Sequence, residues 1–268
     1  NMDPYYSRSE VSNSDLTSLK LKLYPQLDFV KPKDKKKAFH LGTLVDGLVT
    51  EPKNCNHFRY LVGEEQYTKQ EWEWGKKQLE KLRRAAQKDA FLDYVLKNAV
   101  GQKVFANPSQ HFDVGCYSFD LPTRCKFDWH LGLFGGDLKT TVATTYDQFL
   151  NCIDYFEWDR SRAFYMDLTH SLDPSMGNQD FIYAVSKTAN KVFYKKIVRG
   201  DELYERGREK YLEPGSEHSD NKRFLEDCQK WFGIEIQTIR SGKFNNVEDV
   251  LLKKKYINGP TGASCTKE

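Results

Sequence analysis

The sequence has 268 residues, of which 39% are hydrophobic and 14% aromatic, and its formal net charge at pH 7 is +3. This composition is typical of a globular protein with one large domain or two small ones, and no apolar run is long enough to span a membrane. A charge this close to neutral does not indicate a nucleic-acid-binding protein by itself, although lysines cluster at residues 31–37 and 253–255.

The six cysteines are scattered along the chain without a C-x-x-C pair. This pattern argues against a zinc or iron–sulfur site and favours reduced thiols in a cytoplasm. The first residues, Asn1 to Pro4, are polar and acidic and have no signal-peptide character. We therefore expect a cytoplasmic protein.

In the N-terminal part, a capped amphipathic helix is predicted between Ser12 and Pro25, and the lysine-rich residues 31–37 are expected to form a loop. A second helix is predicted over residues 38–50. It is apolar on most sides, yet it carries Asp46. A carboxylate in such a helix is costly unless it is paired or bound to a cation, and the alternative is an Asp46 that faces a loop and is partly exposed.

Further along the chain, apolar periodicity and Pro or Gly breaks predict helices that alternate with short strands. The additional helices are expected at residues 68–98, 146–168, 201–211 and 222–231. The strands are expected at residues 102–105, 115–121, 124–129, 131–139, 181–187 and 191–198. No linker forces two domains, so the pattern predicts one α/β domain over residues 1–247 and a flexible basic tail over residues 248–268.

Three charged residues stand near the ends of two neighbouring predicted strands. Asp128 lies on one strand, and Asp137 and Lys139 lie on the next, where they share a face because side chains alternate along a strand. The two carboxylates would hold a hard divalent cation, and Lys139 could orient a metal-bound water or favour its hydroxide form. An Asp-x-Lys triplet is common, and on the triplet alone a solvated ion pair at a strand end is the better explanation.

Four stretches in a fixed order resemble the PD-(D/E)xK nuclease superfamily and, within it, the phage-type exonucleases of the RecE (exonuclease VIII) group. The first is a helix start that contains Asn13-Ser14-Asp15-Leu16, and the second is the helix that ends in Glu51-Pro52. The third contains Asp128 and Asp137-Leu138-Lys139-Thr140-Thr141, and the fourth is the helical stretch at residues 159–167. Their order and intervals are more specific than any single motif.

This resemblance implies a role for each matching residue. Asp46, Asp128, Asp137 and the carbonyl of Leu138 would bind the metal, and Lys139 would be the catalytic lysine. Possible contacts to substrate fall on Ser161, Tyr165, Arg160, Arg162, Arg124 and Lys126. The chain departs from the family pattern at Ser161, where relatives have a glutamine, and at Gln102, near where relatives often have a glutamate.

The resemblance also implies a restriction-endonuclease-like core, in which a central mixed β-sheet is flanked by helices. The expected activity is Mg²⁺-dependent (or Mn²⁺-dependent) degradation of one strand of linear double-stranded DNA from its 5′ end. The expected partners are DNA ends, further copies of the chain in a ring-like homo-oligomer, and a single-strand annealing protein, with no membrane partner and a bacterial or phage origin. Two alternatives remain open: a DNA-binding protein that has the nuclease fold without turnover, and an endonuclease of the same superfamily.

Overall fold

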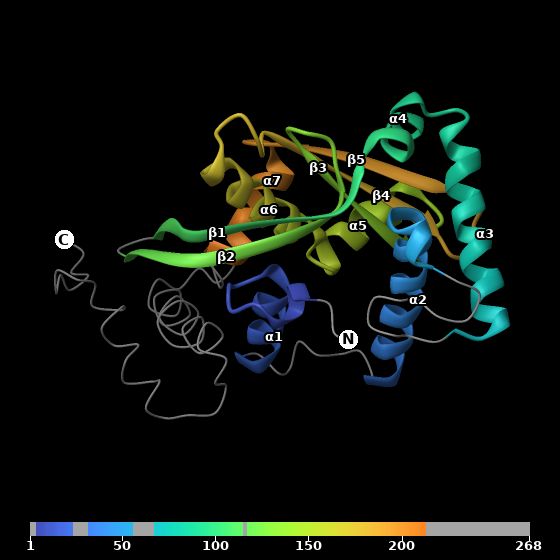
Figure 1. Ribbon diagram of the computed structural model, residues 1–268, viewed down its shortest axis with the longest axis horizontal. Coiled ribbons are helices and arrows are strands. Elements are labelled where there is room, and N and C mark those ends of the chain that lie inside the picture. The colour runs from blue at the N-terminus through green and yellow to red at the C-terminus, as the bar shows by residue number, and fades with distance from the viewer. Residues whose placement is uncertain (1–3, 24–31, 56–66, 115–116, 213–268) are drawn as a thin grey trace.

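The computed structural model describes residues 4–23, 32–55, 67–114 and 117–212 (Figure 1). The helical elements are η1 (Pro4–Ser7), α1 (Asn13–Leu23), α2 (Pro32–Thr50), η3 (Pro52–Asn54), α3 (Lys69–Ala86), α4 (Ala90–Asn98), α5 (Tyr146–Tyr155), α6 (Trp158–Leu172) and α7 (Glu202–Leu212). The strands are β1 (Val100–Val114), β2 (Tyr117–His130), β3 (Gly135–Thr141), β4 (Gln179–Ser186) and β5 (Val192–Val198).

The five strands form one mixed sheet in the order β1-β2-β3-β4-β5. β3 and β4 run parallel, and the other neighbours run antiparallel. β1 and β2 pair along nearly their whole length and form a long ribbon that reaches beyond the other strands (Figure 1). β2 pairs with β3 only through Trp129↔Gly136 and His130↔Gly135, after which the two strands separate. We call this point of separation the β2–β3 fork.

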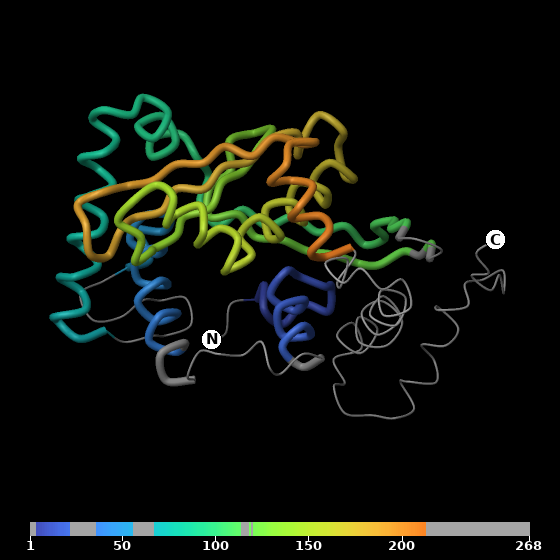
Figure 2. The backbone as a smooth tube through the Cα atoms, turned by 180° about the vertical axis from the view of Figure 1, so that it is seen from behind, coloured from blue at the N-terminus to red at the C-terminus, as the bar shows by residue number. Residues whose placement is uncertain are grey.

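Helices cover both faces of the sheet, as the views from the front and from behind show (Figures 1 and 2). β4 illustrates why. Ile182 and Ala184 pack in a core cluster with α1, α5, α6 and α7, whereas Phe181, Tyr183 and Val185 pack in a second cluster with α2, α3 and α4. Because side chains alternate across a strand, a nearly continuous apolar run supplies both cores.

The predicted fold class is confirmed: the chain is an α/β protein with a mixed sheet flanked by helices in a single domain. The helices predicted before Pro25, at residues 38–50 and at residues 201–211 are present, as are the strands that correspond to β4 and β5. Among the described residues, no helix is both long and apolar enough to cross a membrane. The predicted helix at residues 222–231 and the predicted tail lie outside the described residues.

Two predictions about the ends of helices that precede β1 were wrong. Residues 32–37 are helical, not a loop, because Pro32 suits the first position of a helix and lysine is a good helix former. The single helix predicted at residues 68–98 is divided into α3 and α4. Asp89 begins the second helix by accepting hydrogen bonds from the backbone N–H groups of Phe91 and Leu92.

The boundaries of other elements also differ from the prediction. The helix predicted at residues 146–168 is divided into α5 and α6 at Glu157, whose φ of 52° is left-handed. The strands predicted at residues 115–121 and 124–129 are one strand, because Pro122 is accommodated where the β1–β2 register shifts between Asn107 and Gln110. The strand predicted at residues 131–139 begins only at Gly135 and continues to Thr141.

Candidate active site

Four of the predicted site residues meet at the β2–β3 fork. Asp128 is the residue next to the last β2–β3 pair on β2, and Asp137 is its counterpart on β3. Asp46 approaches from α2, a helix that packs against β1, β2 and β3. The charges of Asp46 and Asp137 raise the pKa of Asp128, after the larger effect of burial. The three carboxyl groups therefore lie close enough to influence one another strongly.

Asp137 and Lys139 share a face of β3 and form an ion pair, with 2.6 Å between Lys139 Nζ and Asp137 Oδ2. Burial alone would lower the pKa of Lys139, but Asp137 and Asp128 raise it above its usual range. Lys139 is consequently held as an ammonium ion at neutral pH. In that state it cannot accept a proton, but it can orient a water or stabilise negative charge on a phosphate.

Asp128 is fixed by the backbone on the other side of the fork. Its Oδ2 accepts a hydrogen bond of 2.8 Å from the backbone N–H of Leu138, the residue after Asp137. The pKa of Asp128 nevertheless lies well above its usual range, mainly because of burial. A cation beside it would favour the ionised form. The proposed role of the Leu138 carbonyl as a ligand stays a prediction.

Asp46 is partly buried and is held by two polar neighbours. Its Oδ2 accepts a hydrogen bond of 3.0 Å from Gln102 Nε2, and its Oδ1 lies 3.3 Å from the hydroxyl of Thr50. Burial raises the pKa of Asp46 to about 6, against the opposing charge of Lys139. The alternative interpretation, an aspartate facing a loop, does not describe this residue, because it takes part in the charged cluster.

Gln102 occupies a strained position beside this cluster. It has a φ of 54°, a left-handed conformation that is uncommon for a residue with a side chain. The β1–β2 ladder pairs Gly101 with Trp129 and Lys103 with Phe127, so Gln102 stands opposite Asp128. Its amide donates to Asp46 and also to Thr50 Oγ1 at 3.0 Å. Gln102 therefore supplies a hydrogen-bond donor to the cluster, and such strain is typical of functional sites.

Arg162 is the residue that α6 contributes to the cluster. Its guanidinium lies 3.6 Å from Asp137 Oδ1 and 3.6 Å from Asp180 Oδ2, and it is stacked on the ring of Tyr165 at 4.2 Å. Its side chain is only 2% exposed. The guanidinium lowers the pKa of Asp137, which burial alone would raise. Arg162 thus keeps Asp137 ionised.

Asp180 was missed by the sequence analysis. It is completely buried at the start of β4, and burial raises its pKa to about 7 although Arg162 opposes this shift. Arg162 thus bridges Asp137 on β3 and Asp180 on β4. The available signal was a single aspartate just before the apolar run Phe181-Ile182, in a strand predicted to be buried.

The other candidates for substrate contact have different surroundings. Ser161 donates to the carbonyl of Trp158 and accepts from Arg162 Nε, so it stabilises α6. Arg160 points toward α1, where it bonds Asn13 and Thr17. Arg124 is buried and donates to the Arg8 carbonyl. All three side chains are engaged within the fold, and their predicted contact with substrate stays a prediction.

Lys126 and Tyr165 remain near the site. Lys126 lowers the pKa of Asp46 through its charge and lies 5.2 Å and 5.1 Å from the rings of Tyr5 and Tyr6. Tyr165 supports the guanidinium of Arg162 and packs edge-on against Phe127. Tyr165 therefore acts through Arg162, whereas Lys126 is a candidate to contact a phosphate.

The donor atoms are of the kind that binds a hard divalent cation, although they do not yet surround one common position. Among the described residues, no three His, Cys, Asp or Glu side chains are already arranged to hold a metal ion. However, the pKa values of Asp46 and Asp128 are raised by burial and by neighbouring carboxylates. Oxygen donors of this kind are those that Mg²⁺ and Mn²⁺ prefer.

Comparisons with known proteins add little to this geometry. No family model matches the sequence, and no curated protein matches it. Among solved structures, the crystal structure of SSO0001 is similar with a TM-score of 0.28 and 11% sequence identity, over 53% of this chain and 62% of that chain. The match therefore spans less than two thirds of SSO0001, and a likeness this weak supports no conclusion about fold or function.

Proposed function

We propose that the chain is a metal-dependent nuclease that hydrolyses phosphodiester bonds of DNA. The observation that supports this proposal is the cluster at the β2–β3 fork, where Asp46, Asp128 and Asp137 lie with the ammonium of Lys139. Carboxylates on neighbouring elements beside a fixed cation suit attack on a phosphate, because negative charge develops on the phosphate oxygens in the transition state.

Mg²⁺ or Mn²⁺, held by Asp46, Asp128 and Asp137, would supply an activated water and neutralise charge on the attacked phosphate. The side chains of the protein then have separate tasks. Lys139, kept protonated by Asp137 and Asp128, orients the water and the scissile phosphate. Arg162 holds Asp137 in its ionised form, and Gln102 fixes the orientation of Asp46.

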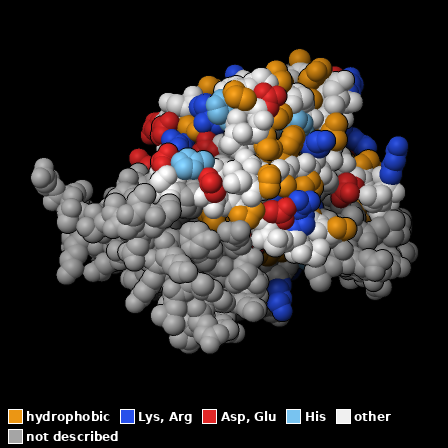
Figure 3. Space-filling view, turned by 60° about the vertical axis from the view of Figure 1, so that its left-hand side comes forward, with side chains coloured by type: hydrophobic (Ala, Val, Ile, Leu, Met, Phe, Trp, Pro, Cys, Tyr) orange, Lys and Arg blue, Asp and Glu red, His pale blue; other side chains and the backbone are white. Residues whose placement is uncertain are grey.

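The substrate we propose is linear double-stranded DNA, degraded from the 5′ end by a ring-like oligomer, and this part rests on the resemblance to the RecE group. On the face drawn in Figure 3, acidic and basic side chains are interspersed. This agrees with a net charge of only +3. An annealing protein would act on the single strand that remains.

Two alternatives share the same site. A DNA-binding protein without turnover is favoured by Ser161, whose hydroxyl is engaged within α6 by the carbonyl of Trp158 and by Arg162 Nε. An endonuclease would use the same groups on an internal bond. The two differ from the main proposal in whether DNA is cut at all, and in whether an end is needed.

One assay compares three substrates in Mg²⁺ or Mn²⁺: linear duplex DNA with 5′ phosphates, the same duplex labelled at the 3′ end, and a covalently closed circle. We expect degradation of the linear duplex alone. Cutting of the circle would indicate an endonuclease, whereas cleavage of none of the three substrates would favour the binding protein.

Asp137→Asn is the matched test of the site, because it preserves the shape of the side chain and removes its charge. We expect it to abolish cleavage and to weaken Mn²⁺ binding by at least about tenfold, since a carboxylate ligand is lost. Asp93→Asn is the control, because Asp93 is an exposed aspartate on α4 that pairs with Lys97. Equal Mn²⁺ binding by both variants would place the metal elsewhere.

A further inference from the structure

The α2 helix joins a basic, exposed end to the candidate active site. Phe39, Gly42 and Asp46 lie at positions i, i+3 and i+7, so they share one face of the helix. Phe39 is about 10 Å from Asp46 along the helix axis, as seven residues at 1.5 Å each require. This face, defined by Phe39, Gly42 and Asp46, is the α2 track.

The α2 track lacks the packing expected of a helix in a folded core. Phe39 is 75% exposed, more than any other large hydrophobic side chain of the described residues. A Cβ atom added at Gly42 would meet nothing within 4 Å, so close packing does not require a glycine there. Gly75 on α3 is different, since a Cβ atom there would press on Leu44. Packing within the protein therefore does not account for the exposed ring of Phe39 or for the glycine at position 42.

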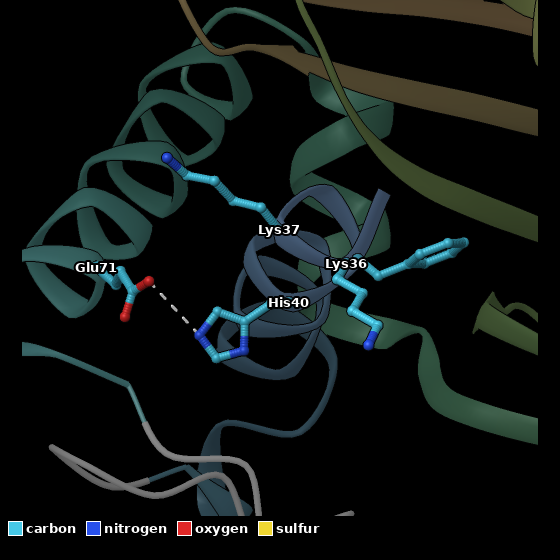
Figure 4. Close-up of a pocket in the computed structure, with 5 residues that line it drawn as sticks. Lys36, Lys37, His40 and Glu71 are labelled. Atoms are coloured by element: carbon cyan, nitrogen blue, oxygen red, sulfur yellow. Dashed lines mark ion pairs between the residues drawn. The ribbon is translucent and has the colours of Figure 1, made fainter. Parts of the chain in front are cut away.

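The residues around Phe39 form an open, positively charged groove. Lys36, Lys37, Phe39, His40 and Glu71 line a cavity of about 530 Å³. In Figure 4, His40 points toward Glu71, which lies 3.6 Å away, while Lys36 and Lys37 project in different directions from the helix. Neither lysine forms an ion pair with another described residue, and both are exposed. Glu71 is already engaged by the Thr68 N-cap as well as by His40.

We propose that the α2 track binds single-stranded DNA, with Phe39 stacked on a base and Lys36, three residues before Phe39 on the neighbouring part of the helix surface, contacting a phosphate. An exposed aromatic ring beside lysines is the usual arrangement for an unpaired strand, because a ring can stack only on a base that is not covered by its neighbour. The 10 Å between Phe39 and Asp46 corresponds to about three nucleotides at 3.4 Å per stacked nucleotide. The strand on this track would thus reach the catalytic carboxylates, so the inference rests on the proposed function for its biological meaning.

The test measures binding without catalysis, using a fluorescently labelled oligothymidine of about 12 nucleotides in the presence of EDTA. We expect Phe39→Ala to weaken binding about tenfold, since one lost base–aromatic stack has an effect of this order. Phe39→Trp should bind at least as well as the wild-type chain. Tyr94→Ala is the matched control, because Tyr94 is an aromatic residue on α4 that is 54% exposed and distant in sequence from the track.

Lys36 is tested by the salt dependence of the same binding. In Lys36→Gln, the slope of log K against log salt concentration should fall by about 0.7, because each contact to a single-stranded phosphate contributes about 0.7. Lys37→Gln is the matched control, because Lys37 lies on the opposite side of the helix from Phe39 and its loss should leave the slope unchanged. An unchanged slope in Lys36→Gln would overturn the assignment of this lysine.

Failure of this inference can be distinguished from failure of the proposed function. If Phe39→Ala binds the oligonucleotide as tightly as Tyr94→Ala does, the α2 track is not a DNA site, whatever the cleavage assay shows. If Phe39→Ala instead converts a dimer to a monomer with unchanged DNA binding, the track is a contact between copies and the inference is wrong. If Phe39→Ala weakens binding but the wild-type chain cuts no DNA with either metal, the track is supported and the nuclease proposal fails.

Discussion

Arg162 offers the sharpest test of how the candidate site is held together. Its guanidinium lies between two buried carboxylates, 3.6 Å from an oxygen of Asp137 and 3.6 Å from an oxygen of Asp180. Replacement by methionine preserves much of the side-chain volume but leaves Asp180 without this cation and Asp137 with Lys139 alone. Removing one partner of a buried ion pair costs about 3–5 kcal/mol. We expect the loss in Arg162→Met to fall within that range.

Urea unfolding in EDTA measures this loss without interference from a bound metal. Asp180→Asn should restore part of the stability of Arg162→Met, because an amide at position 180 no longer needs a cation. The expected coupling between the two positions is about 1–3 kcal/mol, as for other residues in direct contact. The m-value should stay constant, so that the change in midpoint reports stability and not the compactness of the unfolded chain.

Arg160 provides the matched control on the same helix. It is as buried as Arg162, with 2% exposure, but it pairs with Glu157 at 2.7 Å and points toward α1. Arg160→Met should therefore lose stability without any rescue by Asp180→Asn. A loss below about 1 kcal/mol in Arg162→Met, or equal rescue of both variants, would refute the bridging role of Arg162.

Two further predictions concern stability. Burial alone would raise the pKa of Glu157, but Arg160 and Lys20 lower it below its usual range. This stabilisation is fully present above the pKa of Glu157 in the unfolded chain, and it is lost as the pH falls through the pKa of Glu157 in the folded protein. Glu157→Gln should therefore cost about 3 kcal/mol at neutral pH. In acid titrations followed by circular dichroism, the variant should lose less of its stability than the wild type does below about pH 4.5. The second prediction is that Gly136→Ala destabilises the protein by about 1–3 kcal/mol, because a Cβ atom there would overlap the ring of Phe181, while Gly42→Ala raises stability by up to about 1 kcal/mol. Similar unfolding midpoints for the two alanine variants would contradict the packing at the fork.

The sequence predicted the class of fold because its periodicities are local. The apolar runs in β4 and β5 and the cap of α1 depend on neighbours within a few residues. The boundaries that failed depend on features without a periodic signal. Glu157 ends α5 through a left-handed backbone conformation, although the apolar pattern continues across it. Pro122 normally ends a strand, but a register shift in the partner strand admits it.

The site residues could be predicted where they lie on one strand or on neighbouring strands. They could not be predicted where their position depends on how a helix packs against the sheet. Asp137 and Lys139 share a strand face by spacing alone, and Asp128 follows from the adjacent strand. The choice between Ser161 and Arg162 could not be made from spacing, because the two residues differ by 100° around the helix axis and either could face the sheet. Docking of α6 on β4 decides for Arg162, and Asp180 enters the site through that contact only.

The charges at the fork bear on the metal dependence that we propose. Without a metal, the carboxyls of Asp46 and Asp128 favour their protonated forms at higher pH than usual, with a pKa of about 6 for Asp46. Asp137 stays ionised because Arg162 and Lys139 lie beside it. A divalent cation would displace the protons from the first two carboxyls without disturbing the third, since the third already has its own cations. Asp137, Lys139 and Arg162 therefore form a fixed part of the site, and Asp46 and Asp128 form the part that a metal would reorganise. This division explains how the chain can contain the donors for a metal although no three of its described carboxylates are yet arranged around one.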